Sequence, residues 1–171
     1  RSYCCTANTT STNDDCRDLS KSGSTRLRLM RIIKFIPEHA TELVTENKLS
    51  FGTQQPEHDW EHHMKRAAQH DAWTGIENGH IIASAGFIPM WEGVAECWFI
   101  GSDKIQTRIK SVLKTTIDIM SKAPYARMHA NVKADWMEAI RFAEFLGFEK
   151  EGLMKKFGPE GSDYLVMGRI K

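Results

Sequence analysis

Residues 136–152, WMEAIRFAEFLGFEKEG, contain the transition that decides the fold, in which an amphipathic segment ends at a glycine and passes into an extended one. Asp135 precedes this stretch, and an aspartate in the N-cap position accepts hydrogen bonds from free amides of the first helical turn. Gly147 follows the last apolar residue of the segment, and glycine suits the left-handed conformation that often follows a helix. We therefore expect a helix over residues 136–146 and a strand over residues 148–157.

The rest of the chain from residue 27 onward alternates between strand-like and helix-like apolar patterns. Asn78-Gly79 is the strongest short hairpin signal, because both residues tolerate the positive φ angles of a type I′ turn. The expected elements are a strand over 27–36, a helix from Pro37, a helix over 57–70, strands on both sides of Asn78-Gly79, a strand over 94–100, a helix over 103–121, a strand over 125–132, the helix and strand of residues 136–157, and a strand over 164–170. This order predicts an α/β domain with a mixed, mostly antiparallel central sheet of about seven strands and flanking helices.

The composition is that of an ordinary globular domain. The 171 residues suit one hydrophobic core, and 41% of them are hydrophobic and 26% charged. A formal charge of +1 creates no long-range field that would attract nucleic acid or an anionic membrane. No apolar run approaches the roughly 18 residues that a membrane-spanning helix requires. We expect a soluble, cytoplasmic protein that binds neither nucleic acid nor membrane.

The first 26 residues differ in composition from the rest and are expected to lie outside the folded domain. They are rich in Ser, Thr, Asn and Asp and show no apolar periodicity, so burial cannot offset the entropy lost on ordering. Residues 1–26 are interpreted as a disordered or non-native extension, and residues 27–171 as the domain. Met30 stands directly before the strand-like run RIIKFI, which leads to the hypothesis that Met30 is the natural start. N-terminal sequencing of the native protein would test it.

Histidines and cysteines give no metal-binding pattern. His58 and His62 have the i, i+4 spacing of helical metal ligands, but neither the order His-Glu-x-x-His nor a third ligand accompanies them. A solvated helix face is the better interpretation. Cys97 lies alone in an apolar segment and is interpreted as a buried strand residue. No metal site is predicted.

Four segments resemble known proteins. The stretch 139–152, whose helix ends in Leu-Gly-Phe, resembles the last helix and following strand of the GNAT N-acetyltransferase superfamily. Residues 72–75 (AWTG), 98–103 (WFIGSD) and 158–161 (GPEG) resemble, more narrowly, a GNAT-like family encoded by bacteriophages, some of whose members are labelled internal virion proteins. The likeness covers roughly residues 30–171. It implies a GNAT-like fold and acetyl-CoA as the cosubstrate.

The resemblance implies transfer of an acetyl group from acetyl-CoA to an amine, small or part of a protein, that is not identified. A proton must leave the ammonium, whose usual pKa is about 10, before the nitrogen can attack the thioester carbonyl. Glu96, on the central strand, is the candidate general base. Its side chain is expected on the same side of the sheet as Trp98 and opposite to Cys97. An edge or surface carboxylate is the alternative interpretation.

The cofactor motif of the superfamily can be laid on residues 97–113. Phe99, Ile100 and Gly101 then hold the positions at the end of the central strand where backbone groups meet pantetheine. The expected pyrophosphate-binding residues follow them: Lys104, Ile105, Gln106, Thr107 and Arg108. Ile105, Thr107 and Ile109 stand where the superfamily mostly has glycine, which lets a phosphate approach the backbone. Binding of CoA is therefore expected to be weakened.

Two further departures from the superfamily bear on catalysis. Ala143 stands where many relatives have a Tyr near the CoA sulfur, and alanine cannot donate a proton to the leaving thiolate. Trp136 replaces the Asn often found at the start of that helix. Two hypotheses follow: a GNAT-type N-acetyltransferase, or a non-catalytic phage protein of the same fold with a role in the virion or in assembly. The second would place the chain in the host cytoplasm or the virion, with other phage proteins as partners. The oligomeric state is left open.

Overall fold

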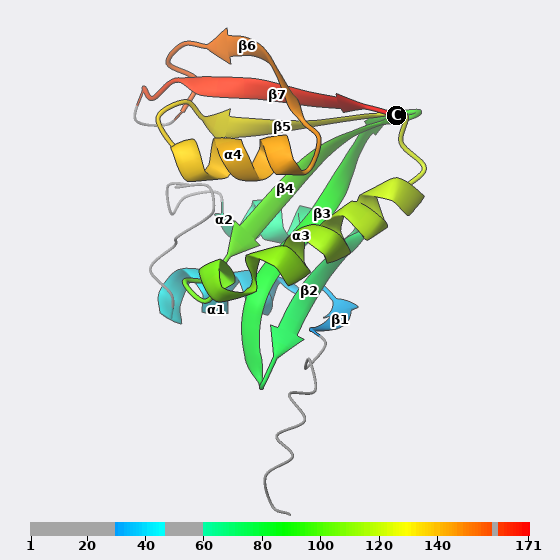
Figure 1. Cartoon of the computed structure of the whole chain (residues 1–171), viewed down its shortest axis with the longest axis vertical. Helices are drawn as coiled ribbons and strands as arrows, with labels where there is room; N and C mark the ends of the chain where they lie inside the picture. The colour runs from blue at the N-terminus through cyan, green and yellow to red at the C-terminus, as the bar shows by residue number, and fades with distance from the viewer. Residues whose placement is uncertain (1–29, 47–59, 159–160) are drawn as a thin grey trace, which may run out of the picture.

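The computed structural model describes residues 30–46, 60–158 and 161–171, which form one sheet with helices on both faces (Figure 1). The elements are, in chain order, β1 (Arg31–Lys34), α1 (Pro37–Glu46), α2 (Trp60–Ala67), β2 (Ala72–Glu77), β3 (His80–Trp91), β4 (Val94–Gly101), α3 (Ile105–Lys122), β5 (Arg127–Lys133), α4 (Met137–Phe145), β6 (Glu149–Met154) and β7 (Tyr164–Ile170). This order of strands and helices confirms the order predicted from the sequence.

The sheet contains seven strands in the order β1-β2-β3-β4-β5-β7-β6. Every neighbouring pair is antiparallel except β4 and β5, which run parallel. Their register covers only Val94–Arg127, Ala95–Met128 and Glu96–His129, after which the two strands diverge (Figure 1). The predicted mixed, mostly antiparallel sheet is confirmed, and it is split in its middle.

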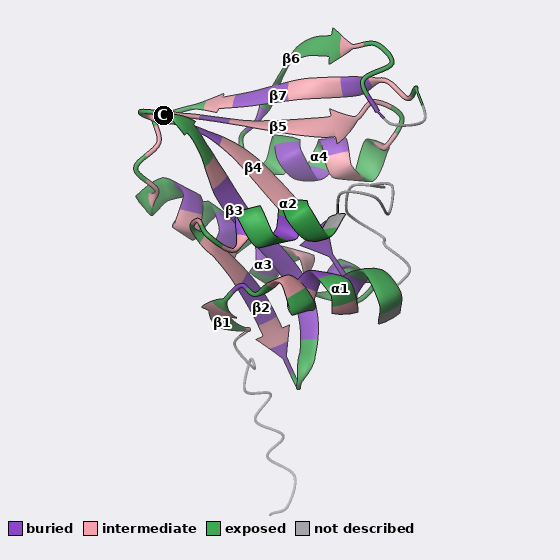
Figure 2. Cartoon of the chain, turned by 180° about the vertical axis from the view of Figure 1, so that it is seen from behind, coloured by how far each residue is buried: buried purple, intermediate pink, exposed green. Residues whose placement is uncertain are grey.

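Each face of the sheet carries its own hydrophobic core. Helices α3 and α4 cover one face, with α3 against β3 and α4 against β5 (Figure 1). Met128, Phe142 and Met167 belong to the core under these two helices. Helices α1 and α2 cover the opposite face (Figure 2). Phe35 and Leu43 are buried in the core on that side. The divergence of β4 and β5 therefore opens a gap in the sheet between its two helical layers.

Two turns form where the sequence predicts them. Asn78 and Gly79 have φ angles of 53° and 79°, as a type I′ turn requires, and they join β2 to β3. Gly147 has a φ angle of 86° directly after α4, so it ends the helix in the left-handed conformation. Both predictions succeed because the turn residues themselves fix the backbone conformation.

The N-terminus of α4 differs from the prediction. Trp136, not Asp135, occupies the N-cap position, and no side-chain hydrogen bond caps the helix. The carboxylate of Asp135 lies 3.7 Å from the ammonium of Lys133. Asp135 thus stands one residue before the cap, where it faces the end of β5 instead of the first helical turn.

Several elements are shorter than their apolar patterns predict. The strand predicted over 148–157 ends at Met154, and Lys156 has a φ angle of 54°, outside the extended range of a regular strand. Helix α3 begins at Ile105 instead of residue 103, and α2 ends at Ala67 instead of residue 70. Alternating or periodic hydrophobicity continues into turns, so it marks the presence of an element better than its end. The predictions for residues 1–29 and 57–59 lie outside the described residues.

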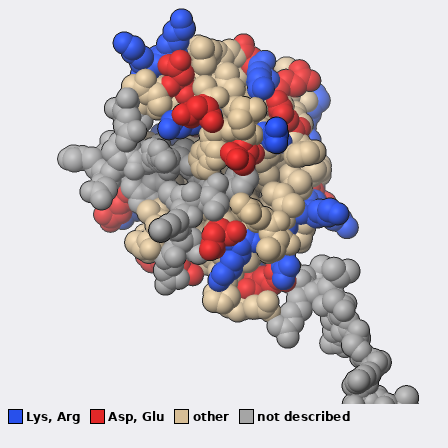
Figure 3. Space-filling model, turned by 60° about the vertical axis from the view of Figure 1, so that its left-hand side comes forward, with Lys and Arg blue, Asp and Glu red and all other residues tan. Residues whose placement is uncertain are grey.

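Charges of both signs are interspersed on the face shown in Figure 3, without a patch of one sign among the described residues there. None of the described helices has the length and apolar character needed to cross a membrane.

Candidate active site

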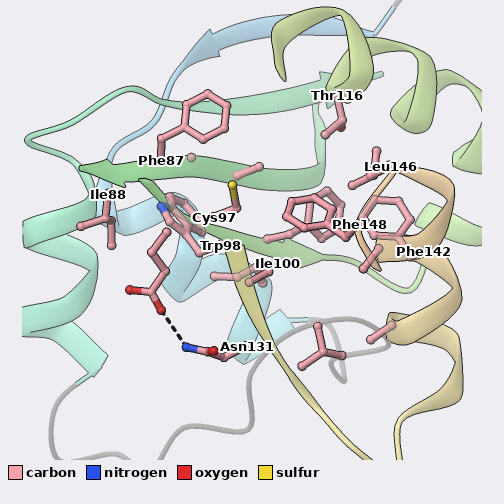
Figure 4. Close-up of a pocket in the computed structure, with 18 of the residues that line it drawn as sticks. Phe87, Ile88, Cys97, Trp98, Ile100, Thr116, Asn131, Phe142, Leu146 and Phe148 are labelled. Carbon is pink, nitrogen blue, oxygen red and sulfur yellow. Dashed lines mark hydrogen bonds between the residues drawn. The ribbon is translucent and has the colours of Figure 1, made fainter. Parts of the chain in front are cut away.

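A pocket of about 440 Å³ lies where β4 and β5 diverge (Figure 4). Its lining comes mainly from α2, β3, β4, β5 and α4, with further residues from β2, α3, β7 and the connection between β6 and β7. Side chains alternate between the two faces of a strand, so the pocket has two chemically different halves. One half lies on the side of α2 and is polar. The other lies on the side of α4 and is almost entirely apolar.

Glu96 belongs to the polar half. The side-chain amide of Asn131, on β5, donates a hydrogen bond of 3.2 Å to Glu96 Oε1 (Figure 4). Trp98, two residues further along β4, packs on the core under α1 and α2, whereas Cys97 packs on the core under α3 and α4. Glu96 therefore lies on the side of Trp98 and opposite to Cys97, as the alternation of the strand predicts.

Among the described residues, packing side chains form most of the apolar half. The rings of Phe99 and Phe142 pack with their centroids 4.6 Å apart, and Ala143 continues this wall. Burial, together with the nearby charge of Glu96 and against an opposing effect of Arg169, raises the pKa of the Cys97 thiol to about 12. Cys97 thus stays protonated and behaves as a packing residue, in a half of the pocket suited to an apolar chain.

Beyond Glu96, the edge of β4 faces the gap where β4 and β5 no longer pair. The amide of Ser102 donates to Ile82 O on β3 at 2.9 Å. Backbone groups of an antiparallel strand point alternately to its two neighbours, and the β3–β4 register is regular from Ile88–Glu96 to Ala83–Gly101. The N–H and C=O groups of Phe99 and Gly101 therefore point toward β5, past the last residue at which β5 pairs. These are backbone groups that a ligand between the strands can reach.

The N-terminus of α3 offers fewer backbone donors than the sequence motif implies. The amide of Ile105 donates to Ser102 O at 3.1 Å, and the amide of Thr107 donates to Lys104 O at 3.2 Å. The Thr107 hydroxyl also donates to Lys104 O, at 2.9 Å, and the Ile105 side chain is buried. Two of the amides that would meet a phosphate are therefore already used inside the protein.

Arg108 is also engaged within the protein. Its Nε forms an ion pair with Glu77 at the end of β2, where the carboxylate side chain is only 8% exposed. Lys104 and Gln106 are exposed. Among the predicted site residues, Glu96, Phe99 and Ile100 line the pocket, whereas Gly101 and the segment 104–108 lie outside its lining.

The pocket residues on β5 and α2 were not predicted from the sequence. Asn131 and Lys133 reach it from β5, and His63 and Arg66 from α2. The alternation of β5 placed Asn131 and Lys133 on one face, but nothing local shows that this face adjoins Glu96. His58 lies outside the described residues, and the described part of the chain holds no group of three potential metal ligands.

Comparison with known proteins gives the fold. No family model matches the chain, and no curated protein matches it either. Among solved structures, the ribosomal-protein-S18-alanine N-acetyltransferase of Escherichia coli is similar over 83% of this chain and 94% of its own, with a TM-score of 0.64 and 16% identity. Ard1 of Thermoplasma volcanium is similar over 82% of this chain and 96% of its own, with a TM-score of 0.64 and 16% identity. The yncA protein of Salmonella typhimurium, whose structure contains its cofactor acetyl-CoA, is similar over 82% of this chain and 93% of its own, with a TM-score of 0.62 and 17% identity. The chain thus has the fold of the GNAT acetyltransferases.

Proposed function

We propose that this chain is an N-acetyltransferase that moves an acetyl group from acetyl-CoA to an amine. The observation that carries the proposal is the pocket at the divergence of β4 and β5, which holds the carboxylate of Glu96 inside a GNAT fold. One of the similar structures contains acetyl-CoA. The two halves of the pocket give an acyl thioester and a polar acceptor separate places to bind.

The residues on the open edge of β4 fit the acyl end of acetyl-CoA. This cosubstrate would supply an acetyl group activated as a thioester. The amides of Phe99 and Gly101 point to the opening, where they could hold the thioester carbonyl and an extended amide-bearing arm, and Ile100 lies between them. The apolar wall of Phe99 and Phe142 suits the methyl and methylene groups of such an arm.

The diphosphate of acetyl-CoA would be bound by side chains more than by backbone amides. In this proposal Lys104 and Gln106, which are exposed, supply charge and hydrogen bonds at the N-terminus of α3. Ile105 and Thr107 contribute less, because their amides are engaged, and Arg108 contributes only the part of its guanidinium that Glu77 does not hold. Affinity for CoA is expected to be modest for this reason.

Glu96 is the proposed general base. An amine reaches the carbonyl carbon only as the free base, so its ammonium must first lose a proton. Asn131 binds one oxygen of the carboxylate, and the other oxygen can take this proton directly or through a water molecule. Asn131 is thus a positioning residue for Glu96.

A second candidate function has specific support. Ala143 lines the apolar half and cannot donate a proton to a leaving thiolate, and two N-terminal amides of α3 are used internally. These features favour a non-catalytic GNAT-fold protein, and the likeness of residues 72–75, 98–103 and 158–161 to the phage family would give it a role in a virion or in its assembly.

Titration with acetyl-CoA, followed by an assay for acetylated amines, separates the two candidates. A single-site ligand at 100 times its dissociation constant raises the free energy of unfolding by about 2.7 kcal/mol, which a thermal-shift experiment detects. Glu96→Gln is expected to keep this binding and to lower kcat by roughly 100-fold or more. Glu92→Gln, an exposed carboxylate in the turn after β3, is the matched control. Lack of binding at millimolar acetyl-CoA would rule out the proposed acetyltransferase activity. Binding without any turnover would favour the second candidate.

A further inference from the structure

The charges around the pocket are unequal. Of the described residues that line it, Glu96 is the one carboxylate, whereas Lys133 and Arg66 bring two permanent cations. This imbalance is local, because acidic and basic side chains are interspersed on the molecular face of Figure 3. The described lining of the pocket therefore holds two permanent cations against one carboxylate.

Lys133 is built into the polar half. It lies two residues beyond Asn131 on β5, so its side chain leaves the strand on the same face. It is paired in register with the buried Tyr164 of β7, and its side chain is only 23% exposed. Asp135 Oδ2 lies 3.7 Å from its Nζ, which is an ion pair but too long for a hydrogen bond, and the Asp135 side chain is 74% exposed. The ammonium of Lys133 can thus donate to a ligand in the pocket.

Arg66 brings a second cation from α2. It is exposed on α2, lines the pocket, and has no ion pair with any residue that the structure describes. Its neighbour Lys65 differs in both respects, because it pairs with Glu61 at 2.6 Å and does not line the pocket. Of these two adjacent cations on α2, Arg66 therefore contributes its charge to the pocket, whereas Lys65 contributes its charge to the outer surface.

We infer that the acceptor amine carries an anionic group, a carboxylate or a phosphate, that binds between Lys133 and Arg66 while the amine binds at Glu96. This inference rests on the proposed function and names its substrate class. A guanidinium and an ammonium both form charge-assisted hydrogen bonds with such anions, and a half-buried lysine does so with less loss to solvent. A polyamine would instead meet two cations beside a single carboxylate, so its binding is disfavoured.

Calorimetric titration of the full chain, with saturating CoA present so that no turnover occurs, tests this inference. The probes are matched pairs that share an amine: β-alanine against β-alaninamide for the carboxylate, and 2-aminoethyl phosphate against ethanolamine for the phosphate, with spermidine as the polycation. We expect at least one anionic probe to bind about tenfold more tightly than its neutral partner. The pair that shows the larger ratio identifies the anion.

Three variants locate the effect. Arg66→Gln and Lys133→Met are expected to reduce the anionic preference severalfold while leaving the neutral probes unchanged, and Lys65→Gln is expected to leave the preference intact. Arg66 is exposed, so its substitution tests the site even if Lys133→Met folds poorly. The inference is overturned if neither anionic probe exceeds its neutral partner, if spermidine binds as tightly, or if Lys65→Gln has the same effect as Arg66→Gln. Failure of the proposed function would show separately, as no binding of acetyl-CoA and no acetylated product from any amine.

Discussion

The side-chain amide of Asn131 donates to Glu96 Oε1 at 3.2 Å across the junction where β4 and β5 cease to pair. Glu96 is the last residue of β4 in register with β5, opposite His129, and Asn131 stands two residues further along β5. The contact therefore spans the opening and not the paired part of the sheet. It holds one oxygen of the carboxylate at the edge of the pocket that Glu96 lines.

Replacement of Asn131 by Ala should lower kcat/KM for amine acetylation by about tenfold, because a hydrogen bond to a charged group that orients the base is lost. Asn131→Asp should lower it further, since it places a second carboxylate beside Glu96. Acetyl-CoA affinity, measured by thermal shift, should not change in either variant. Equal loss of cosubstrate binding and of turnover would show that Asn131 supports the pocket's structure and not the base.

Arg108→Ala should destabilise the fold by about 1–3 kcal/mol, because it leaves the buried carboxylate of Glu77 without its partner. The effect stays below that of a fully buried pair, since the Arg108 side chain is 45% exposed. Urea unfolding measures it, and Lys104→Ala, at an exposed position of the same turn, should change stability by less than about 0.5 kcal/mol. In a Glu77→Gln background the cost of Arg108→Ala should largely disappear. A cost that persists in this background would contradict the assigned role of the pair.

Gly86→Ala should cost about 1–3 kcal/mol through overpacking. An added Cβ would lie 2.7 Å from Ala72 Cβ, 2.8 Å from Trp98 Nε1 and 2.9 Å from the backbone oxygen of Asp71, and the backbone oxygen cannot move aside cheaply. Gly152→Ala on β6 is the matched control, because nothing lies within 4 Å of its added Cβ. It should be neutral or stabilising by about 0.4–1 kcal/mol. Equal denaturation midpoints for the two variants would refute this packing argument.

Acidification should weaken the fold partly through His39. The amide of Ile36 donates to His39 Nδ1 at 3.3 Å, so this nitrogen accepts, and the Thr74 hydroxyl at 2.9 Å donates to it as well. Burial lowers the pKa of His39 below its usual 6.5, against the opposing charges of two nearby glutamates. The unfolded chain thus takes up a proton at a higher pH than the folded one, and stability falls as pH drops below about 6.5 toward the folded pKa.

His39→Asn, which keeps an acceptor but cannot titrate, should reduce the loss of unfolding free energy between pH 7.5 and 5. His80→Gln, at an exposed position beside the β2–β3 turn, serves as the comparison. Urea unfolding at several pH values gives the two slopes. A slope in His39→Asn as steep as that of the unchanged protein would exclude His39 as a source of the pH dependence.

Local sequence determined the elements and their order, because helix and strand signals act over a few residues. Gly147 ends a helix and Asn78-Gly79 forms a hairpin through their own backbone preferences. The alternation of β4 also placed Glu96 and Trp98 on one face before any neighbour was known. The helix caps and element ends were less well determined, as Asp135 shows, because they depend on which partner a side chain meets.

Tertiary structure alone decided the site. Glu96 and Asn131 are 35 residues apart in the chain, and they meet only because a parallel pairing of three residues sets the register of β4 against β5. The same holds for Arg108, which the sequence left free for a phosphate and the fold pairs with Glu77, 31 residues earlier. Local pattern fixes which face a side chain occupies, because that depends on the strand's own geometry. Contacts between strands depend on register and on where pairing stops, which are set by the packing of the whole sheet between its two helical layers.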